Sequence, residues 1–238
     1  FGRDKFDALL CPRPGHVDLA GMLKYGFDDL RNVWERSSAR STAILVAFGA
    51  LAKQFLKKFG IHFFSFTVRI GEVGISPIKS LNVSWIKKSL LRCPDREAER
   101  KMLTEIGKAQ KDGDSLGGVF GIVVENVPVG LGTYTDFSSK LDARIAHALV
   151  SIPSIKGIEF GLGFDYAYQH GSEVHDEIFY SPKRGFYRKT NNAGGIEGGV
   201  SNGEDIVLKC VVKPIPSLKV PLRSVDIKSK KAKRSCVL

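Results

Sequence analysis

Residues 11–40 read CPRPGHVDLAGMLKYGFDDLRNVWERSSAR, and the rest of the chain is best interpreted from this stretch. The sequence PRPG, directly before His16, predicts a stiff turn because proline and glycine favour turn geometry. A short helix is expected over residues 19–25, with Asp18 as its N-terminal cap and Gly26 as its stop. The pattern therefore holds His16 on a rigid turn just ahead of a helix.

The same stretch is rich in positive charge. It holds five cationic side chains besides the histidine, namely Arg13, Lys24, Arg31, Arg36 and Arg40. Guanidinium groups on turns suit phosphate and carboxylate ligands, so one interpretation is a site for a small, highly anionic molecule. The alternative is a solvated basic surface with an ordinary histidine, and the stretch alone does not exclude it.

Composition and charge narrow the kinds of binding partner. The chain has 238 residues and a formal net charge of +11, which is compatible with nucleic acid, an anionic membrane or small anionic ligands as partners. Its arginines lie in turns rich in glycine, proline and serine instead of in a basic stripe with interleaved aromatics, so we expect neither a nucleic-acid nor a membrane partner. The basic run KSKKAKR at residues 228–234 is interpreted as a solvated tail or loop.

The cysteines and the apolar runs agree with a cytoplasmic protein. Four cysteines lie far apart without a CxxC pair, which predicts free thiols and no metal site. The sequence has no run of eighteen apolar residues. No signal peptide is expected.

The periodicity predicts an α+β fold. A largely apolar helix, capped by Ser37 or Ser38 and continuing to residue 59, should be buried. Further helices are expected over 94–111 and 140–151, the latter capped by Ser138 or Ser139. Strands are expected over 61–70, 119–127, 156–164 and 205–213. Residues 165–203 read as a long functional loop. Layers of antiparallel sheet with helices between them follow from these elements.

Several long motifs resemble chorismate synthases and occur in the same order. They are RPGHVDL (13–19), KYG (24–26), RSSAR (36–40), GDSLGG (113–118), KLDAR (140–144), GSEVHDE (171–177), NNAGGIEGGVSNG (191–203), KPIPS (213–217) and PLRSVDI (221–227). The resemblance covers nearly the whole chain. It implies one chorismate synthase-like domain over residues 1–238, built as a layered sandwich of antiparallel β-sheets that enclose helices.

The resemblance also implies a function. Chorismate synthases are carbon–oxygen lyases of the shikimate pathway, which makes the aromatic amino acids. They bind reduced FMN and remove phosphate and a ring hydrogen, in a 1,4 relation, from 5-enolpyruvylshikimate 3-phosphate. NADPH would be needed only where the enzyme reduces its own flavin. A homo-oligomer is expected, with a tetramer favoured.

Site residues follow from the matched motifs. His16 corresponds to the family histidine that lies against the flavin and manages its protonation, and Arg13 to an arginine that grips the substrate. The residues expected to contact the flavin are Arg36, Ser37, Ser38, Pro153, Ser154, Gly198, Lys213, Pro214, Ile215, Pro216, Ser217 and Arg234. From the residues alone, the RSS triplet is equally explained as a plain helix cap. His175 and Asp176 are expected to anchor a loop, and Asp114 and Ser115 to fix a turn.

Two departures from the family pattern bear on activity. The family's N-terminal segment, with its GxSHG histidine and substrate-binding arginines, has no counterpart here, and neither does its C-terminal helix. Cys236 stands where the family has aspartate. We therefore expect a polypeptide with these ends to bind reduced FMN weakly and to make essentially no chorismate. The alternative function is a flavin-binding or assembly-competent fragment without turnover.

Overall fold

The computed structural model describes residues 7–75 and 81–236, and these residues form an α+β fold, as predicted. By its internal contacts the chain divides into two compact units. One unit, called unit 1 below, holds the described residues up to Leu45, together with Ile106–Leu116 and the described residues from Pro214 onward. The other, unit 2, holds the described residues of Val46–Glu105 and Gly117–Lys213. The prediction of a single domain stays a prediction.

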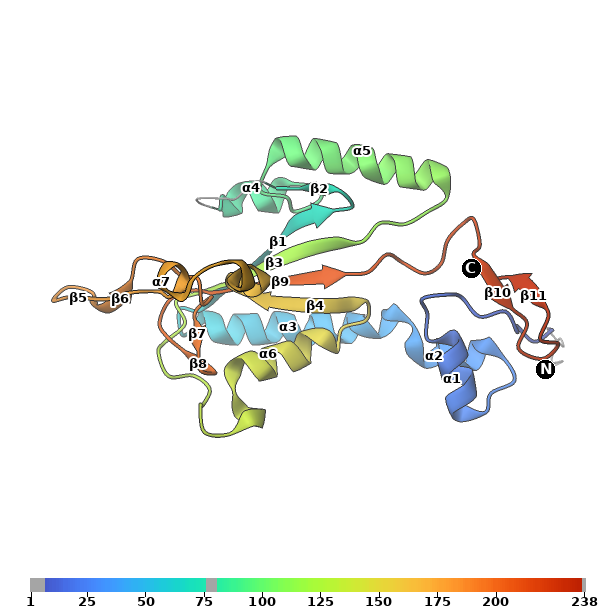
Figure 1. Cartoon of the computed structure of the whole chain (residues 1–238), viewed down its shortest axis with the longest axis horizontal. Coiled ribbons are helices and arrows are strands. Elements are labelled where there is room, and N and C mark those ends of the chain that lie inside the picture. The colour runs from blue at the N-terminus through green and yellow to red at the C-terminus, as the bar shows by residue number, and fades with distance from the viewer. Residues whose placement is uncertain (1–6, 76–80, 237–238) are drawn as a thin grey trace. The chain divides into compact units, whose positions relative to one another are not determined.

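A five-stranded sheet is the centre of unit 2 (Figure 1). Its strands lie in the order β2-β1-β3-β9-β4, and all neighbours pair antiparallel. Their bounds are β1 (His62–Ile70), β2 (Val73–Gly74), β3 (Gly118–Glu125), β4 (Ile155–Phe160) and β9 (Ile206–Val212). The four strands predicted from periodicity are therefore confirmed, with β2 added at an edge.

Alternation along β9 shows why these residues form a sheet. Ile206, Leu208 and Cys210 are buried, while residues between them are less so. Because successive side chains of a strand point to opposite faces, this pattern directs one face toward the core. Leu141, from α6 (Leu141–Val150), packs against that cluster, and so does Leu56 of α3 (Thr42–Lys57). The apolar core of unit 2 thus lies between the sheet and these two helices.

The N-terminal end of α6 differs from the prediction. Lys140 occupies the capping position without a side-chain hydrogen bond, and Ser138 and Ser139 belong to the preceding short helix η2 (Phe137–Ser139). Ser138 Oγ donates instead to Asp136 Oδ2 at 2.8 Å. The prediction that one of these serines caps α6 is therefore wrong, because a nearer carboxylate engages the hydroxyl.

A second apolar cluster joins the edge of the sheet to α5 (Arg96–Asp112). Cys93, Ala98 and Met102 are buried there against Ile70 and Val73 and their neighbours. The short helix α4 (Val83–Lys88) precedes this cluster in the chain and is capped by Asn82, which accepts a hydrogen bond from the backbone of Trp85. From sequence, residues 71–91 are interpreted as irregular, but β2 and α4 both lie there. Pro77 is outside the described residues.

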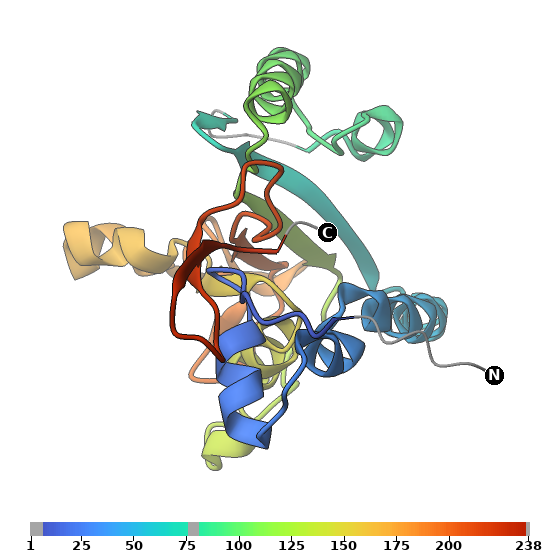
Figure 2. The same cartoon turned by 90° about the vertical axis from the view of Figure 1, so that its right-hand side faces the viewer.

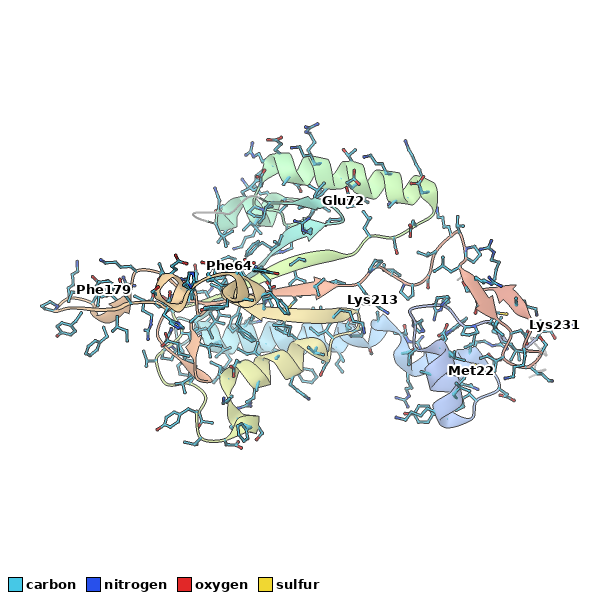
Figure 3. The ribbon with its side chains drawn as sticks, viewed as in Figure 1. Met22, Phe64, Glu72, Phe179, Lys213 and Lys231 are labelled. Atoms are coloured by element: carbon cyan, nitrogen blue, oxygen red, sulfur yellow. The ribbon has the colours of Figure 1, made fainter. Side chains whose placement is uncertain are left out.

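Residues 165–203 are more ordered than the predicted loop. They contain η3 (Gly163–Tyr168), α7 (Gly171–Val174), β5 (Ile178–Ser181), β6 (Gly185–Arg188), β7 (Ile196–Glu197) and β8 (Val200–Ser201). β5 and β6 form a hairpin whose rings pair across the strands, Phe179 with Tyr187 and Tyr180 with Phe186 (Figure 3). Each element is too short to produce a clear sequence period, which explains why the pattern suggested a loop.

Unit 1 is built from helices and one hairpin. The elements that lie wholly in it are α1 (Asp18–Tyr25), α2 (Leu30–Ser37), the short helix η1 (Ala39–Ser41), β10 (Arg223–Val225) and β11 (Ala232–Arg234). Met22, Leu30 and Val33 form its core, and Met22, labelled in Figure 3, lies on α1. Backbone hydrogen bonds from Ile227 N to Leu10 O and from Cys236 N to Cys11 O fix the N-terminal segment beside the hairpin (Figure 2).

The apolar helix predicted to run from residue 37 or 38 to residue 59 is divided and exposed. Ser37 is the last residue of α2, Ser38 caps η1 by accepting from Arg40 N, and α3 begins at Thr42. None of the residues of α3 is buried in the described chain. The prediction of a buried helix is therefore wrong here, because the described elements cover only part of a helix that is apolar on most sides. None of the described helices is long and apolar enough to cross a membrane.

Candidate functional site

His16 lies on the turn that the sequence predicted. Its backbone N–H donates to Arg13 O at 3.2 Å, and Gly15 before it has φ +77°. That left-handed conformation favours glycine, since a Cβ there is strained. The His16 side chain is 18% exposed and its Nδ1 lies 2.5 Å from Asp18 Oδ1. The turn therefore places the imidazole on a rigid backbone, and Asp18 holds the ring through Nδ1.

Asp18 is the centre of a buried hydrogen-bond cluster. Its side chain is fully buried. Oδ2 accepts from Arg13 N at 3.0 Å and from Arg13 Nε at 2.8 Å. Oδ1 accepts from Arg13 Nη2 at 3.1 Å and from Trp34 Nε1 at 2.8 Å. The prediction that Asp18 caps α1 is wrong, because Val17 holds the capping position and the carboxylate points to these partners.

The charge state of Asp18 follows from this environment. Burial acts to raise the pKa of the carboxyl, but the hydrogen bonds from Arg13 and the nearby charges of His16 and Arg13 outweigh it. The pKa of Asp18 consequently lies below its ordinary value. Asp18 is a carboxylate at neutral pH, and its buried charge is compensated by Arg13.

Arg13 holds this cluster to the C-terminal segment. Its guanidinium is buried, donates through Nη1 to Ser217 Oγ at 2.8 Å and lies 4.8 Å from the centre of the Trp34 ring. A Cβ placed on Gly15 would lie 3.7 Å from Pro216 Cβ, so the turn and the 214–217 segment are neighbours. The structure thus brings together Arg13, His16 and Ser217, three of the residues predicted for the site.

A cavity of about 500 Å³ in unit 1 borders this cluster. Its wall includes His16 and Arg13, together with Leu19 and Leu23 of α1 and Val225 of β10. Lys230 adds a second cation. An imidazole and positive charge beside apolar surface suit an anionic ligand with an apolar ring system.

Arg36, Ser37 and Ser38 occupy the junction of α2 and η1. Arg36 is exposed in the last turn of α2. Among the described residues, Ser37 Oγ is buried without a hydrogen-bond partner. A buried hydroxyl without a partner is unfavourable by about 1–3 kcal/mol, so this position is chemically suited to a bound polar group.

Four of the predicted flavin contacts belong to unit 2. Pro153 and Ser154 lie between α6 and β4, and Lys213 N donates to Ser154 O at 3.0 Å directly after β9 (Figure 3). Gly198 is in the tight turn between β7 and β8 with φ +60°, and a Cβ built there meets nothing within 4 Å. The structure therefore brings Ser154 and Lys213 together, and Gly198 has room at its Cα.

The remaining predicted contacts lie in unit 1 after β9. Pro214 and Ile215 belong to the segment that ends at Ser217, and Ile215 O accepts from Ser115 Oγ at 2.7 Å. Arg234 is exposed in β11 and donates through Nη1 to Pro221 O at 3.1 Å. Cys236 donates from Sγ to Cys11 O at 2.9 Å. The roles assigned to these residues stay predictions.

The geometry agrees with the anchoring predictions for Asp176 and Asp114, while the role expected of His175 stays a prediction. Asp176 accepts from Asn192 N and Ala193 N, both at 2.8 Å, and from Thr190 Oγ1. Asp114 Oδ1 accepts from Ser115 N at 2.7 Å in the turn after α5. These contacts make Asp176 a support of the 190–193 segment.

Trp34 was not identified from the sequence. It reaches Asp18 from the next helix along the chain, and a tryptophan on an amphipathic helix is ordinarily interpreted as a core residue. The sequence did contain a signal for Asp18, the residue that Trp34 contacts. An acidic residue two positions after a histidine on a turn can contact the ring, and Asp18 has this spacing from His16.

Comparisons with known proteins agree with the motifs. The family model described as chorismate synthase matches residues 4–237. The chain is 57% identical over 225 residues to the chorismate synthase of Alkaliphilus metalliredigens, covering 93% of this chain and 59% of that protein. It is 47% identical over 234 residues to chorismate synthase 2 of Bacillus cereus, covering 97% of this chain and 60% of the relative.

A solved structure gives the same result for the fold. A crystal structure of chorismate synthase superimposes with a TM-score of 0.79 at 44% identity, covering 84% of this chain and 63% of the other. The chain therefore spans about three fifths of the length of the curated relatives it matches.

Proposed function

The chain belongs to the chorismate synthase family, and from this premise we propose that the protein converts 5-enolpyruvylshikimate 3-phosphate to chorismate. The reaction removes phosphate and a ring hydrogen, so it needs a proton-transfer group and cations for an anionic substrate. The observation that carries the proposal is His16, fastened by its Nδ1 to a buried carboxylate and placed in the wall of a cavity.

Reduced FMN is the proposed cofactor. The buried Ser37 Oγ, which has no partner among the described residues, fits a polar group of a bound ligand. Arg36, Ser38, Pro153, Ser154, Gly198, Arg234 and the 213–217 segment would hold the flavin with it. When bound, reduced FMN supplies the electron-rich ring that the family's elimination requires, although no net electrons are consumed. NADPH would be required only if the enzyme reduces the flavin itself.

His16 has the proton-handling role in this proposal. Imidazole changes charge near neutral pH, and a fixed ring can hold or release a proton at one defined nitrogen. Arg13 is proposed for substrate binding through its positive charge. Because its guanidinium is buried against Asp18, its action would be through the field at the cavity wall. Lys230, which lines the same cavity, is the second cation for an anionic substrate.

Replacement of His16 tests the function. In the complete gene product, His16→Ala should lower the rate of chorismate formation by roughly 10²–10⁴-fold, the usual contribution of a positioned proton-transfer group. Chorismate absorbance is followed without oxygen, with chemically reduced FMN. His147→Ala, at an exposed position of α6, is the control and should leave the rate unchanged. An unaltered rate in His16→Ala would remove His16 from the site, and flavin binding without any product would favour the non-catalytic alternative.

The flavin contacts are tested separately. Arg36→Ala and Ser38→Ala should weaken the affinity for reduced FMN more than they lower the melting temperature, because the proposal gives these residues a ligand. Flavin fluorescence and thermal unfolding of the same samples provide the two measurements. Lower melting temperature with unchanged flavin affinity would assign the triplet a capping role only.

We propose further that the enzyme is a cytoplasmic homo-oligomer, with a tetramer favoured.

A further inference from the structure

We propose that Asp18 is a positioning residue: its buried carboxylate accepts the Nδ1 proton of His16 and so fixes the imidazole tautomer whose Nε2 carries the lone pair. Arg13 and Trp34 hold the carboxylate in the orientation that this requires. The consequence for turnover rests on the proposed function, whereas the tautomer itself does not.

The first step is that N–H donors surround both oxygens of the Asp18 carboxylate. Besides His16, four N–H groups donate to it: three from Arg13 and the indole N–H of Trp34, at distances of 2.8 to 3.1 Å. A carboxylate without solvent must have its lone pairs matched by donors, and here donors approach both oxygens. The carboxylate therefore has one orientation, and the oxygen nearest His16 is determined.

The second step is the direction of the bond to His16. An ionised carboxylate only accepts hydrogen bonds, so the proton between Asp18 Oδ1 and His16 Nδ1 must be carried by the imidazole. Arg13 Nη2 lies 3.1 Å from the same Nδ1, but a guanidinium is also only a donor and already donates to Asp18 Oδ1. The contact of Nδ1 with Asp18 Oδ1 is the shorter of the two, at 2.5 Å, and a carboxylate oxygen at that distance needs a proton on Nδ1. Nδ1–H leaves no lone pair on this nitrogen for Arg13, so the carboxylate determines the tautomer.

The third step is the support behind the carboxylate. Trp34 lies on α2, sixteen residues along the chain from Asp18, and the Arg13 guanidinium both stacks near its ring and reaches Ser217. The carboxylate is therefore held by its own turn and by α2, and Arg13 links it to the segment of Ser217. An orientation defined by several packed segments resists rotation of the His16 ring better than a single bond would.

The chemical consequence concerns Nε2. In a neutral imidazole with hydrogen on Nδ1, Nε2 is the nitrogen that accepts a proton. The carboxylate also stabilises the imidazolium that forms when Nε2 is protonated. Among the described residues, Asp18 and Arg13 lie beside this ring, and Lys230 lines the same cavity. Asp18 is the only carboxylate among these three, and it determines which nitrogen is available.

The tautomer is measured directly by nitrogen NMR of the protein labelled at histidine, with the His16 signals assigned by their loss in His16→Gln. The wild-type ring should show hydrogen on Nδ1 above its titration range. In Asp18→Asn the amide N–H₂ can donate to Nδ1, which should move the hydrogen to Nε2. Finding hydrogen on Nε2 in the wild type would overturn the proposal even if the variant failed to fold.

A matched control separates positioning from stability. Asp29 caps α2 and accepts hydrogen bonds from Arg31, so it is also an aspartate paired with an arginine in unit 1. Asp29→Asn should leave the His16 tautomer unchanged. Trp34→Phe removes one donor and should make the ring signals of His16 heterogeneous without reversing the tautomer. An unchanged tautomer in a folded Asp18→Asn would contradict the proposal.

Turnover gives the second measurement. In the complete gene product, Asp18→Asn should lower kcat by roughly 10-fold or more, the usual effect of losing a partner that orients a reactive imidazole. KM should change less than kcat, since the Asp18 side chain is fully buried and has no surface to offer a substrate. If the wild type makes no chorismate but Asp18→Asn still reverses the His16 tautomer, the proposed function is refuted and the inference about the tautomer stands. A reversed tautomer with undiminished kcat would refute the positioning role.

Discussion

Asp226 controls the turn between the two strands of the unit 1 hairpin. Its Oδ1 accepts from Lys228 N at 3.1 Å and Ser229 N at 2.8 Å, and its Oδ2 accepts from Lys233 Nζ at 2.9 Å. The hydrogen bond from Lys233, followed by that from Ser229 N, holds the pKa of the Asp226 carboxyl well below its ordinary range. The folded state therefore prefers the ionised form.

The pH dependence of stability follows from that direction. Because the folded pKa is depressed, the contribution of Asp226 is present above the unfolded pKa of about 3.9 and is lost as pH falls from there toward the folded value. Asp226→Asn should lower the melting temperature at pH 7, and its difference from the wild type should shrink below about pH 4. Circular dichroism melts at pH 7 and pH 3 measure this. Lys233→Met should behave alike, and an equal deficit at both pH values would contradict the assignment.

At the scale of residues, the sequence could identify chemistry but not partners. The motif around His16 identified an imidazole on a rigid turn, and the structure confirms the turn. It did not indicate that Asp18 faces Trp34 or that Arg13 reaches Ser217, since these contacts span 16 and 204 positions. An aspartate before an apolar run is ordinarily a helix cap. Only the fold shows that this carboxylate has stronger donors elsewhere.

The interior of α5 contains a glycine that does not serve the fold. Gly107 is helical, and a Cβ built there meets nothing within 4 Å. Glycine within a helix is destabilising relative to alanine by about 0.5–1 kcal/mol, because its unfolded backbone has more freedom to lose. Gly107→Ala should therefore raise the free energy of unfolding by about that amount. Urea titration followed by circular dichroism gives the value.

A glycine in the sheet provides the matched contrast. Gly121 of β3 pairs with Phe66 of β1, and a Cβ on it would lie 2.5 Å from that ring. Gly121→Ala should destabilise by about 1–3 kcal/mol, the usual effect of overpacking. The two variants should therefore change stability in opposite directions. If Gly107→Ala and Gly121→Ala both stabilise the protein, or both destabilise it, the space around one of these glycines differs from that described.

At the scale of elements, long regular patterns were predictable and short ones were not. The four central strands and the helices α5 and α6 have enough residues for a clear period, and their predicted bounds agree to within a few residues. β5 and β6 have four residues each, and β7 and β8 have two, so no period can develop. The apolar helix was predicted to start at Ser37 or Ser38, whereas α3 starts at Thr42, because RSSAR contains no glycine or proline to mark the break before it.

At the scale of the molecule, the residues that the family motifs predict for the site are divided between the two compact units. His16, Arg36 and Ser217 belong to unit 1, while Ser154 and Gly198 belong to unit 2. The family motifs predicted which residues belong to this set but not the distances between them, because motifs in the same order indicate shared ancestry and say nothing about contacts. What the sequence could not supply is which members touch, since that depends on packing between segments far apart in the chain.

The apolar surface of α3 leads to a prediction for the whole molecule. Phe48, Leu51 and Phe55 are 63%, 64% and 63% exposed and are spaced to share one side of the helix. Contiguous apolar side chains on this scale favour association, because burying them removes unfavourable contact with water. We expect the 238-residue chain to self-associate at micromolar concentration, as light scattering coupled to size exclusion would show.

A pair of variants with the same change in charge tests whether that surface is responsible. Phe48→Glu combined with Leu51→Glu lowers the net charge by two and places carboxylates on the apolar face, so the mean mass should fall toward that of a monomer. Lys53→Glu also lowers the net charge by two, but it replaces an exposed polar side chain of the same helix. It should leave the mass distribution unchanged, because it removes no apolar area. A wild-type chain that is monomeric, or an equal response of both variants, would contradict an apolar contact through α3.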